Sequence, residues 1–162
     1  MAYIELTAMV CLMSLLENIK IAFIGAGNMA RSLIGGLLKT GFSAENIRAF
    51  DPDPEALKHC ARLGPVSICE NNSIATGGAD VVILAVKPQV VREACQGIHT
   101  VVNDHNVVLI TIAAGITTSY VKNCFEGESK IVRCMPNTPA LIGCGVSGLF
   151  AQCNVDDREK SI

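Results

Sequence analysis

Short, strongly apolar runs recur along this chain, and a turn and a segment with helical spacing of apolar residues follow most of them. The runs lie at 19–24, 47–50, 66–69, 81–86, 107–113, 130–134 and 146–151. The segments between them predict helices at 28–39, 55–63, 72–77, 90–102 and 118–125. Parallel neighbours require crossover connections, which are right-handed. The pattern therefore predicts an α/β fold in one domain, with a doubly wound, mostly parallel sheet between two layers of helices.

The length of the chain fits one domain rather than two. It has 162 residues, half of them hydrophobic and only 4% aromatic, so Ala, Val, Ile and Leu must build the core. Residues 1–18 precede the alternating pattern and are predicted to form an N-terminal extension, either an added helix or a loosely ordered segment. Its apolar stretch, 9–16, is too short to span a membrane, and no basic residue precedes it as in a signal peptide. We expect the domain to cover 19–155, and 156–162 to open a further helix.

Charge and cysteine spacing argue against several classes of partner. The net charge is −2 and the pI is about 5.9. There is no run of like charges, which disfavours nucleic acid as a partner, and no membrane partner is expected. The eight cysteines include no C-x-x-C pair and no zinc-type Cys/His spacing, so no metal site is expected. Because most of them lie in apolar runs, we expect reduced, buried thiols in a cytosolic protein.

The segment Gly25-Ala26-Gly27-Asn28-Met29-Ala30 follows the first predicted strand and opens the first predicted helix. It fits G-x-G-x-x-G/A, a pattern that is meaningful in this context. Gly25 permits a tight turn, Gly27 has no Cβ to keep a phosphate from the backbone, and Ala30 allows close helix–strand packing. The helix N-terminus favours an anion. The segment predicts a Rossmann-type domain that binds the pyrophosphate of a nicotinamide cofactor; the alternative is a glycine-rich turn of an unrelated α/β protein.

Asp51 ends the second predicted strand, about twenty residues after the glycine turn. A carboxylate at this point accepts hydrogen bonds from the adenosine ribose hydroxyls and repels a 2′-phosphate, which slightly favours NADH over NADPH. Two observations leave the choice between NADH and NADPH undecided. Asp51 also begins an Asp-Pro turn, which is a sufficient reason for its presence. Arg48 and Lys58 lie close enough in sequence to accommodate a 2′-phosphate instead.

Three further segments make the pattern more specific. They are Ala85-Val86-Lys87-Pro88, Ala113-Ala114-Gly115 and Arg133-Cys134-Met135-Pro136-Asn137-Thr138-Pro139-Ala140. In this order and spacing, together with the glycine turn, they resemble the pyrroline-5-carboxylate reductases, from about residue 19 to the end of the chain. That family reduces the imine of 1-pyrroline-5-carboxylate to L-proline, the last step of proline synthesis, with NAD(P)H as the cofactor. The segment 135–140 is the most specific part of the resemblance.

The resemblance implies a role for each matching residue. Gly25, Ala26, Gly27, Asn28 and Met29 would hold the pyrophosphate, and Asp51 and Asn72 would contact the adenosine side. Ala85, Val86, Lys87 and Pro88 would line the strand end near the cofactor, and Ala113, Ala114 and Gly115 would flank the nicotinamide. Met135, Pro136, Asn137 and Thr138 would form the wall where the ring and the substrate meet. Lys87 is titratable, and either acts as a catalytic acid or, as we favour, positions the cofactor or faces solvent.

The chain departs from the family in one respect. The family has a second, all-helical domain that forms the dimer and supplies much of the substrate pocket, and its Ser-, Gly- and Thr-rich motifs have no counterpart here. We therefore expect residues 156–162 to lead toward such a domain, the full-length protein to be a cytoplasmic homo-oligomer, and this chain alone to be a nearly inactive monomer. Two other classes stay open: another Rossmann reductase, such as a β-hydroxyacid dehydrogenase, and a non-catalytic nucleotide-binding or regulatory module.

Overall fold

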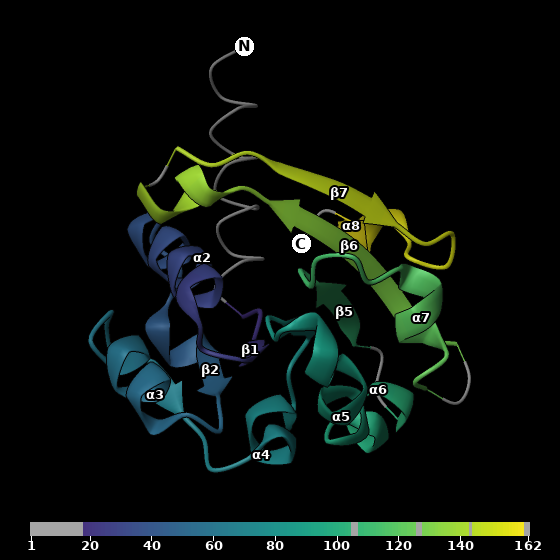
Figure 1. Ribbon diagram of the computed structural model, residues 1–162, viewed down its shortest axis with the longest axis horizontal. Helices are drawn as coiled ribbons and strands as arrows, with labels where there is room; N and C mark the ends of the chain where they lie inside the picture. Colours follow the sequence, from purple (N-terminus) through teal and green to yellow (C-terminus); the bar gives the residue numbers. More distant parts are fainter. Residues whose placement is uncertain (1–17, 105–106, 126–127, 143, 161–162) are drawn as a thin grey trace.

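The computed structural model describes residues 18–104, 107–125, 128–142 and 144–160, and its centre is a seven-stranded sheet (Figure 1). The strands are β1 (Ile21–Ile24), β2 (Ile47–Phe50), β3 (Ser67–Ile68), β4 (Val81–Leu84), β5 (Val108–Thr111), β6 (Lys130–Pro136) and β7 (Ser147–Ala151). Their order is β3-β2-β1-β4-β5-β6-β7. The first six are parallel, and β7 runs antiparallel to β6. The predicted fold class, a mostly parallel α/β sheet, is confirmed.

Helices cover both faces of this sheet. One face carries α2 (Asn28–Lys39) and α3 (Pro54–Ala61). The other carries α4 (Asn72–Thr76), α5 (Val91–Gln96), α6 (His99–Asp104) and α7 (Thr118–Lys122). Three short 3₁₀ helices, η1 (Ala44–Asn46), η2 (Pro88–Val90) and η3 (Thr138–Ile142), lie in the connections, and α8 (Asp157–Lys160) follows β7. The chain is therefore wound on both sides of the sheet, as expected for a doubly wound domain.

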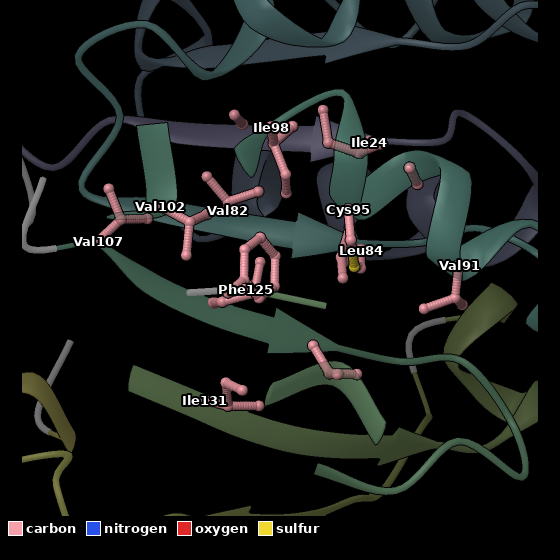
Figure 2. Packing of buried hydrophobic residues seen from close by; sticks show 14 of the residues in the cluster. Ile24, Val82, Leu84, Val91, Cys95, Ile98, Val102, Val107, Phe125 and Ile131 are labelled. Atoms are coloured by element: carbon pink, nitrogen blue, oxygen red, sulfur yellow. The ribbon is translucent and has the colours of Figure 1, made fainter. Parts of the chain in front are cut away.

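The core consists of two clusters, one on each face of the sheet. Side chains of successive strand residues point to opposite faces, so Ile24 packs under α4–α7 while Phe23 packs under α2 and α3. Figure 2 shows the first cluster, in which Val82, Leu84 and Ile131 from the strands meet Cys95 and other helix residues. Because both faces are covered, β1 and β4 are buried at every position. This explains why those strands are uninterrupted apolar runs in the sequence.

Several local predictions match the structure. The helix at 28–39 has the predicted bounds, and Gly41 just beyond it has a positive φ, +90°. The amide of Gly41 donates to the Leu38 carbonyl and that of Phe42 to Leu37, the bonds of a Schellman motif. Pro54 occupies the first turn of α3, where its missing N–H costs nothing.

Other boundaries differ from the sequence expectation. The single helix predicted at 90–102 is wrong: it is divided into α5 and α6 at Gly97 and Ile98. The Asn72 amide occupies the space beside Gly97, since its Nδ2 would lie 2.6 Å from a Cβ placed there. Met135 and Pro136 belong to β6 and not to a loop, because β7 pairs with β6 as far as these residues. The strands predicted at 81–86 and 107–113 end at Leu84 and Thr111.

The cysteines divide into three environments. Cys60, Cys95 and Cys134 are buried, Cys69 and Cys124 half-buried, and Cys144 and Cys153 exposed, and all seven are free thiols. The prediction of buried thiols is therefore wrong for the last two, and Cys11 lies outside the described residues. Burial raises the pKa of the Cys95 thiol to about 12, and the adjacent Cys124 adds to the rise.

Within the described ranges, the structure contains no cluster of three or more metal-ligating side chains. Nor does any helix in those ranges have the length and apolar character needed to cross a membrane.

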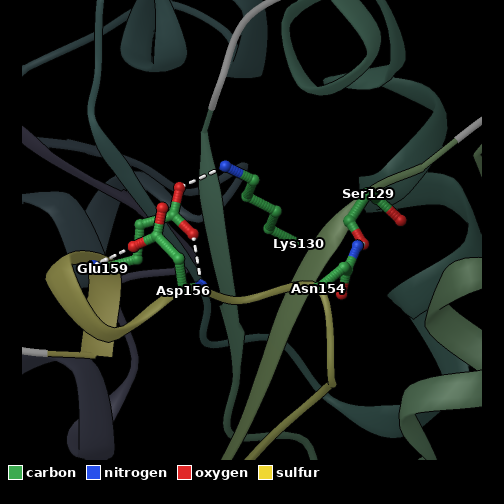
Figure 3. A network of polar contacts seen from close by, with 5 residues as sticks. All are labelled: Ser129, Lys130, Asn154, Asp156 and Glu159. Carbon is green, nitrogen blue, oxygen red and sulfur yellow. Dashed lines mark hydrogen bonds and ion pairs between the residues drawn. The ribbon is translucent and has the colours of Figure 1, made fainter.

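The end of the described chain is fixed to the sheet by a polar network (Figure 3). The amide of Glu159 donates to Asp156 Oδ1 at 2.8 Å, and the amide of Asp156 donates to Glu159 Oε2 at 2.9 Å. This reciprocal pair is a capping box at the start of α8. The Glu159 carboxylate also pairs with the Lys130 ammonium at the start of β6. Since their side chains are 8% and 21% exposed, this is a largely buried ion pair.

We predict that Lys130→Met destabilises the domain by about 3 kcal/mol, because it leaves the buried Glu159 carboxylate without its partner. Urea denaturation measures the change. Lys58→Met is the control, since Lys58 and Glu55 form a pair in which both side chains are 64% exposed. It should change the free energy of unfolding by less than about 0.5 kcal/mol, because solvent screens that pair. Equal effects of the two substitutions would contradict the prediction.

Candidate functional site

The segments singled out in the sequence meet along one edge of the sheet. They follow β1, β2, β4 and β5, and the last of them ends β6. Because these strands are parallel neighbours, their carboxyl ends lie side by side (Figure 1). In open α/β sheets this edge is where ligands bind. The segments on which the resemblance rests therefore lie together at this edge, although this does not by itself assign a role to any residue.

Gly25 forms the tight turn that leaves β1. It has a φ of +100°, and a Cβ on it would lie 2.5 Å from the carbonyl oxygen of Ala85. Its amide donates to the Phe50 carbonyl at 2.8 Å, and the amide of Ala85 donates to Ile24 at 2.8 Å. The ends of β1, β2 and β4 are thus held together at this turn. No other residue type fits there, which agrees with the role predicted for Gly25.

Gly27 and the start of α2 provide an open backbone surface. A Cβ on Gly27 would have no heavy atom within 4 Å, so the space beside it is free. Gly27 is the N-cap of α2 and supplies no side-chain cap, and no acidic residue lies in the first turn. The first amides of this helix are therefore free of side-chain acceptors and carry its positive dipole. Ala30 is 1% exposed and packs against the sheet, as predicted.

Asp51 holds the same turn from the side of β2. Its Oδ2 accepts a hydrogen bond from the Ala26 amide at 2.7 Å, and its Oδ1 accepts one from the Asp53 amide at 2.9 Å. The second bond confirms that Asp51 begins the turn into α3. The first bond was not expected from the sequence, and it ties the glycine turn to the end of β2. Each oxygen has a further lone pair, so the carboxylate can still accept a hydroxyl donor.

Two segments of small residues follow β4 and β5. Ala85 and Val86 are half-buried, whereas Lys87 is exposed and caps η2, which begins at Pro88. After β5, Ala113 is 2% exposed, and its amide donates to the Thr111 hydroxyl at 3.3 Å. Ala114 and Gly115 are exposed beyond it. The two segments lie at adjacent strand ends and have mostly short side chains. A flat group can therefore lie close to the backbone there.

The segment from Met135 to Thr138 connects β6 to η3. Met135 is 37% exposed and pairs with Gly148, and Pro136 pairs with Ser147. Asn137 accepts a hydrogen bond from the Val146 amide through Oδ1 at 3.0 Å, which closes the loop between β6 and β7. Thr138 opens η3, which packs on α2. The predicted wall is thereby fixed next to the helix that begins at the glycine turn.

Three further residues considered in the sequence, Asn72, Arg48 and Lys58, lie in different surroundings. Asn72 packs beside Gly97, and its Oδ1 is buried without a hydrogen-bond partner. The Arg48 guanidinium donates to the Gly77 carbonyl at 2.7 Å, and Lys58 pairs with Glu55. The structure therefore engages Arg48 and Lys58 in contacts other than those needed to accommodate a 2′-phosphate.

Arg31 was missed by sequence reasoning. Its guanidinium donates to Asn28 Oδ1, and both side chains line a cavity of about 290 Å³ with Ser32 and Ala140. Arg31 also lies near Cys60 of α3: burial raises the pKa of that thiol, and the guanidinium charge opposes the rise. The signal available in the sequence was a cation one turn into the helix that starts at Gly27. It places a positive charge close to the free amides of α2.

This sheet order, with a glycine turn at the first crossover, defines an α/β domain of the Rossmann type. The family described as NADP oxidoreductase coenzyme F420-dependent matches residues 20–115, and the chain belongs to it.

Known proteins agree with the resemblance seen in the sequence. The chain is 45% identical over 141 residues to pyrroline-5-carboxylate reductase of Haemophilus influenzae, covering 87% of this chain and 51% of the relative. A solved reductase from Coxiella burnetii superposes with a TM-score of 0.83 at 34% identity, covering 87% and 52% of the two chains. One from Plasmodium falciparum, with NADP bound, gives 0.78 at 27%, covering 90% and 52%. The predicted resemblance is confirmed, and the chain spans about half the length of the curated relatives it matches.

We predict that Gly25→Ala destabilises the domain by about 3 kcal/mol, because its Cβ would strike the Ala85 backbone at an unfavourable φ. Gly27→Ala serves as the matched control. It adds the same methyl group two residues away, in open space, and should leave the urea midpoint nearly unchanged. A stable Gly25→Ala chain would show that the turn relaxes away from Ala85.

Proposed function

We propose that this chain is the cofactor-binding part of an NAD(P)H-dependent pyrroline-5-carboxylate reductase, an enzyme of proline biosynthesis whose substrate is the small molecule 1-pyrroline-5-carboxylate. The observation that carries the proposal is the turn at Gly25 and Gly27, with the free amides of α2 beside it and small residues at the neighbouring strand ends. The similarity to reductases over 87% of the chain supports the substrate. The same similarity favours a pyrroline-5-carboxylate reductase over a β-hydroxyacid dehydrogenase.

The arrangement fits a dinucleotide. The open space beside Gly27 and the uncapped helix N-terminus suit a pyrophosphate, to which Arg31 adds a nearby positive charge. In the proposal, the pyrophosphate is held by Gly25, Ala26, Gly27, Asn28 and Met29. The adenosine is held by Asp51 and Asn72, and the nicotinamide side by Ala85, Val86, Lys87, Pro88, Ala113, Ala114 and Gly115. The bound NADP of the Plasmodium falciparum relative supports this choice of ligand.

The proposed reaction is the transfer of a hydride from the cofactor to the substrate. NAD(P)H supplies, when bound, the hydride that reduces an imine carbon. The residues of this chain would orient the two reactants and exclude water: Ala113 and Gly115 would flank the nicotinamide, and Met135 and Asn137 would limit the space beside it. Lys87 is exposed next to η2, and we assign it a positioning role rather than that of a catalytic acid.

Asp51 is proposed to favour NADH slightly over NADPH. Its carboxylate lies at the end of β2, where its two oxygens accept hydrogen bonds from the amides of Ala26 and Asp53. A 2′-phosphate near this carboxylate would be repelled, whereas ribose hydroxyls can donate to it. The contact of the Arg48 guanidinium with the Gly77 carbonyl supports the same preference.

The domain organisation of the whole protein and its oligomeric state are part of the proposal. We assign residues 19–155 to the cofactor domain, 1–18 to an extension, and 156–162 to the helix that leads to a dimerisation domain. The full-length protein is then a cytoplasmic homo-oligomer without a nucleic-acid or membrane partner, and this 162-residue chain a monomer. A non-catalytic nucleotide-binding module is the alternative that the experiments below distinguish from the reductase.

Titration of the chain with NADH and NADPH, followed by nicotinamide fluorescence, tests the cofactor. We expect saturable binding of both, with NADH tighter by about tenfold, or about 1.4 kcal/mol. Gly27→Ala should abolish binding of both cofactors while the chain stays folded, because the methyl group fills the proposed phosphate space. If neither cofactor binds the folded wild-type chain, the glycine turn is only structural. Tighter binding of NADPH would reverse the role given to Asp51.

Turnover of 1-pyrroline-5-carboxylate to proline tests the reaction. We expect almost none from the 162-residue chain, because orientation of a second reactant requires walls on more than one side. Addition of the C-terminal half of the Haemophilus influenzae reductase as a separate polypeptide should raise the rate, with Gly27→Ala as the inactive control. Robust turnover by the chain alone would contradict the expected inactivity. Cofactor binding without turnover under every condition would favour the non-catalytic module.

A further inference from the structure

An apolar groove lies on the α2 side of the sheet, and it shares Ser32 and Ala140 with the cavity beside Arg31. Its volume is about 460 Å³. Leu33 and Leu37 of α2 form one wall, Ile83 and Ile110 of the central strands form the floor, and Leu149 of β7 lies on the far side. Among the described residues that line it, none is charged. Leu149 is 71% exposed, so an apolar surface is left uncovered beside α2.

The two faces of β5 differ in how well they are covered. Leu109 points toward α4–α7 and is fully buried, whereas Ile110 points into the groove and is only partly buried. On the α2 side, Val81 and Ile83 of β4 line the groove but are buried, so Ile110 of β5 is the strand residue of its floor that is left partly exposed. Exposed aliphatic surface of this kind is stabilised when an apolar element covers it. The groove therefore requires an occupant with an apolar face.

The chain enters the sheet next to this groove. Ile19 packs against the same core cluster as Leu33 and Leu37, and Ile21 lines the groove itself. The backbone of Lys20 is fixed to the start of β4: its amide donates to Asp80 Oδ2 at 2.8 Å, and its carbonyl accepts the Asp80 amide at 2.9 Å. Whatever precedes residue 18 must therefore begin at the edge of the groove.

The sequence of residues 1–17 has the properties that the groove requires. Ile4, Ala8, Leu12 and Leu15 fall at i, i+4, i+8 and i+11, which places them on one side of a helix. Thr7 and Ser14 lie about 100° away round such a helix. The segment contains neither Gly nor Pro. As a helix it would be about 25 Å long, close to the roughly 23 Å of a seven-residue strand such as β6.

We propose that the groove is the docking site of the chain's own N-terminal segment, residues 1–17, which packs the stripe Ile4, Ala8, Leu12 and Leu15 against Leu33, Ile110 and Leu149. The fixed entry at Lys20 makes the contact intramolecular, which lowers the entropic cost of docking. A helix of this length is marginal in water on its own, so it gains its order from the groove. Covering Ile110 and Leu149 in turn stabilises the sheet.

Hydrogen exchange of residues 1–17, measured by mass spectrometry on the full 162-residue chain, tests the proposal. We expect exchange slowed by about tenfold or more relative to an unstructured peptide. Two substitutions should abolish the protection. A8D/L15D places charges on the stripe, and L149D places one on the groove at an exposed position that the sheet tolerates.

Matched controls separate docking from other causes. T7D/S14D introduces the same charges with the same spacing, about 100° away from the stripe round the helix. F150D changes the neighbouring residue of β7, which is 61% exposed and points to the opposite face. Both should keep the protection. Rapid exchange in the wild-type chain, or equal loss in variants and controls, would overturn the proposal. Protection that depends on protein concentration would also overturn it and assign the groove to a second copy.

Discussion

The contact between Gly25 and Ala85 is the constraint on which the site depends. The turn leaves β1 so close to the end of β4 that a single added carbon would strike the carbonyl of Ala85. The Phe50 carbonyl and the Asp51 carboxylate hold the same turn from β2. Three strand ends are therefore fixed by one short piece of backbone. The amides of α2 point outward because the residues behind them are packed in this way, and the open space at Gly27 exists only in that setting.

Much of this arrangement was predictable because it is local. The bounds of α2 and β2 follow from short-range spacing, and the glycine turn is identified by the apolar run before it and the helix after it. The close packing of Asn72 against Gly97, where the predicted helix is divided, was not predictable, because Asn72 lies 25 positions earlier in the sequence. Pro136 is typical of a turn, yet Met135 and Pro136 extend β6 because the antiparallel strand β7 pairs with both of them.

The sequence predicts which residues belong to the candidate site, but it does not predict the hydrogen bonds that they form. The order of the segments brings the residues to one edge, as expected for parallel strands. The bond from Asp51 to Ala26 joins residues 25 apart and has no signature in either segment. Arg31 resembles any surface cation of an amphipathic helix until its position beside Asn28 and the cavity is known. Such contacts depend on side-chain direction in three dimensions, which periodicity does not determine.

The two edge strands of the sheet differ in how readily another strand can pair with them. At one border β3 has two residues, too few to template a further strand. At the other, β7 has five residues and only β6 as a described partner, with Leu149 and Phe150 exposed on its two sides. A row of backbone donors and acceptors flanked by aliphatic and aromatic side chains is the usual starting point for edge-to-edge association. Self-association of this chain at high concentration would therefore proceed from the β7 border, and a lysine in place of Phe150 would oppose it without touching the glycine turn.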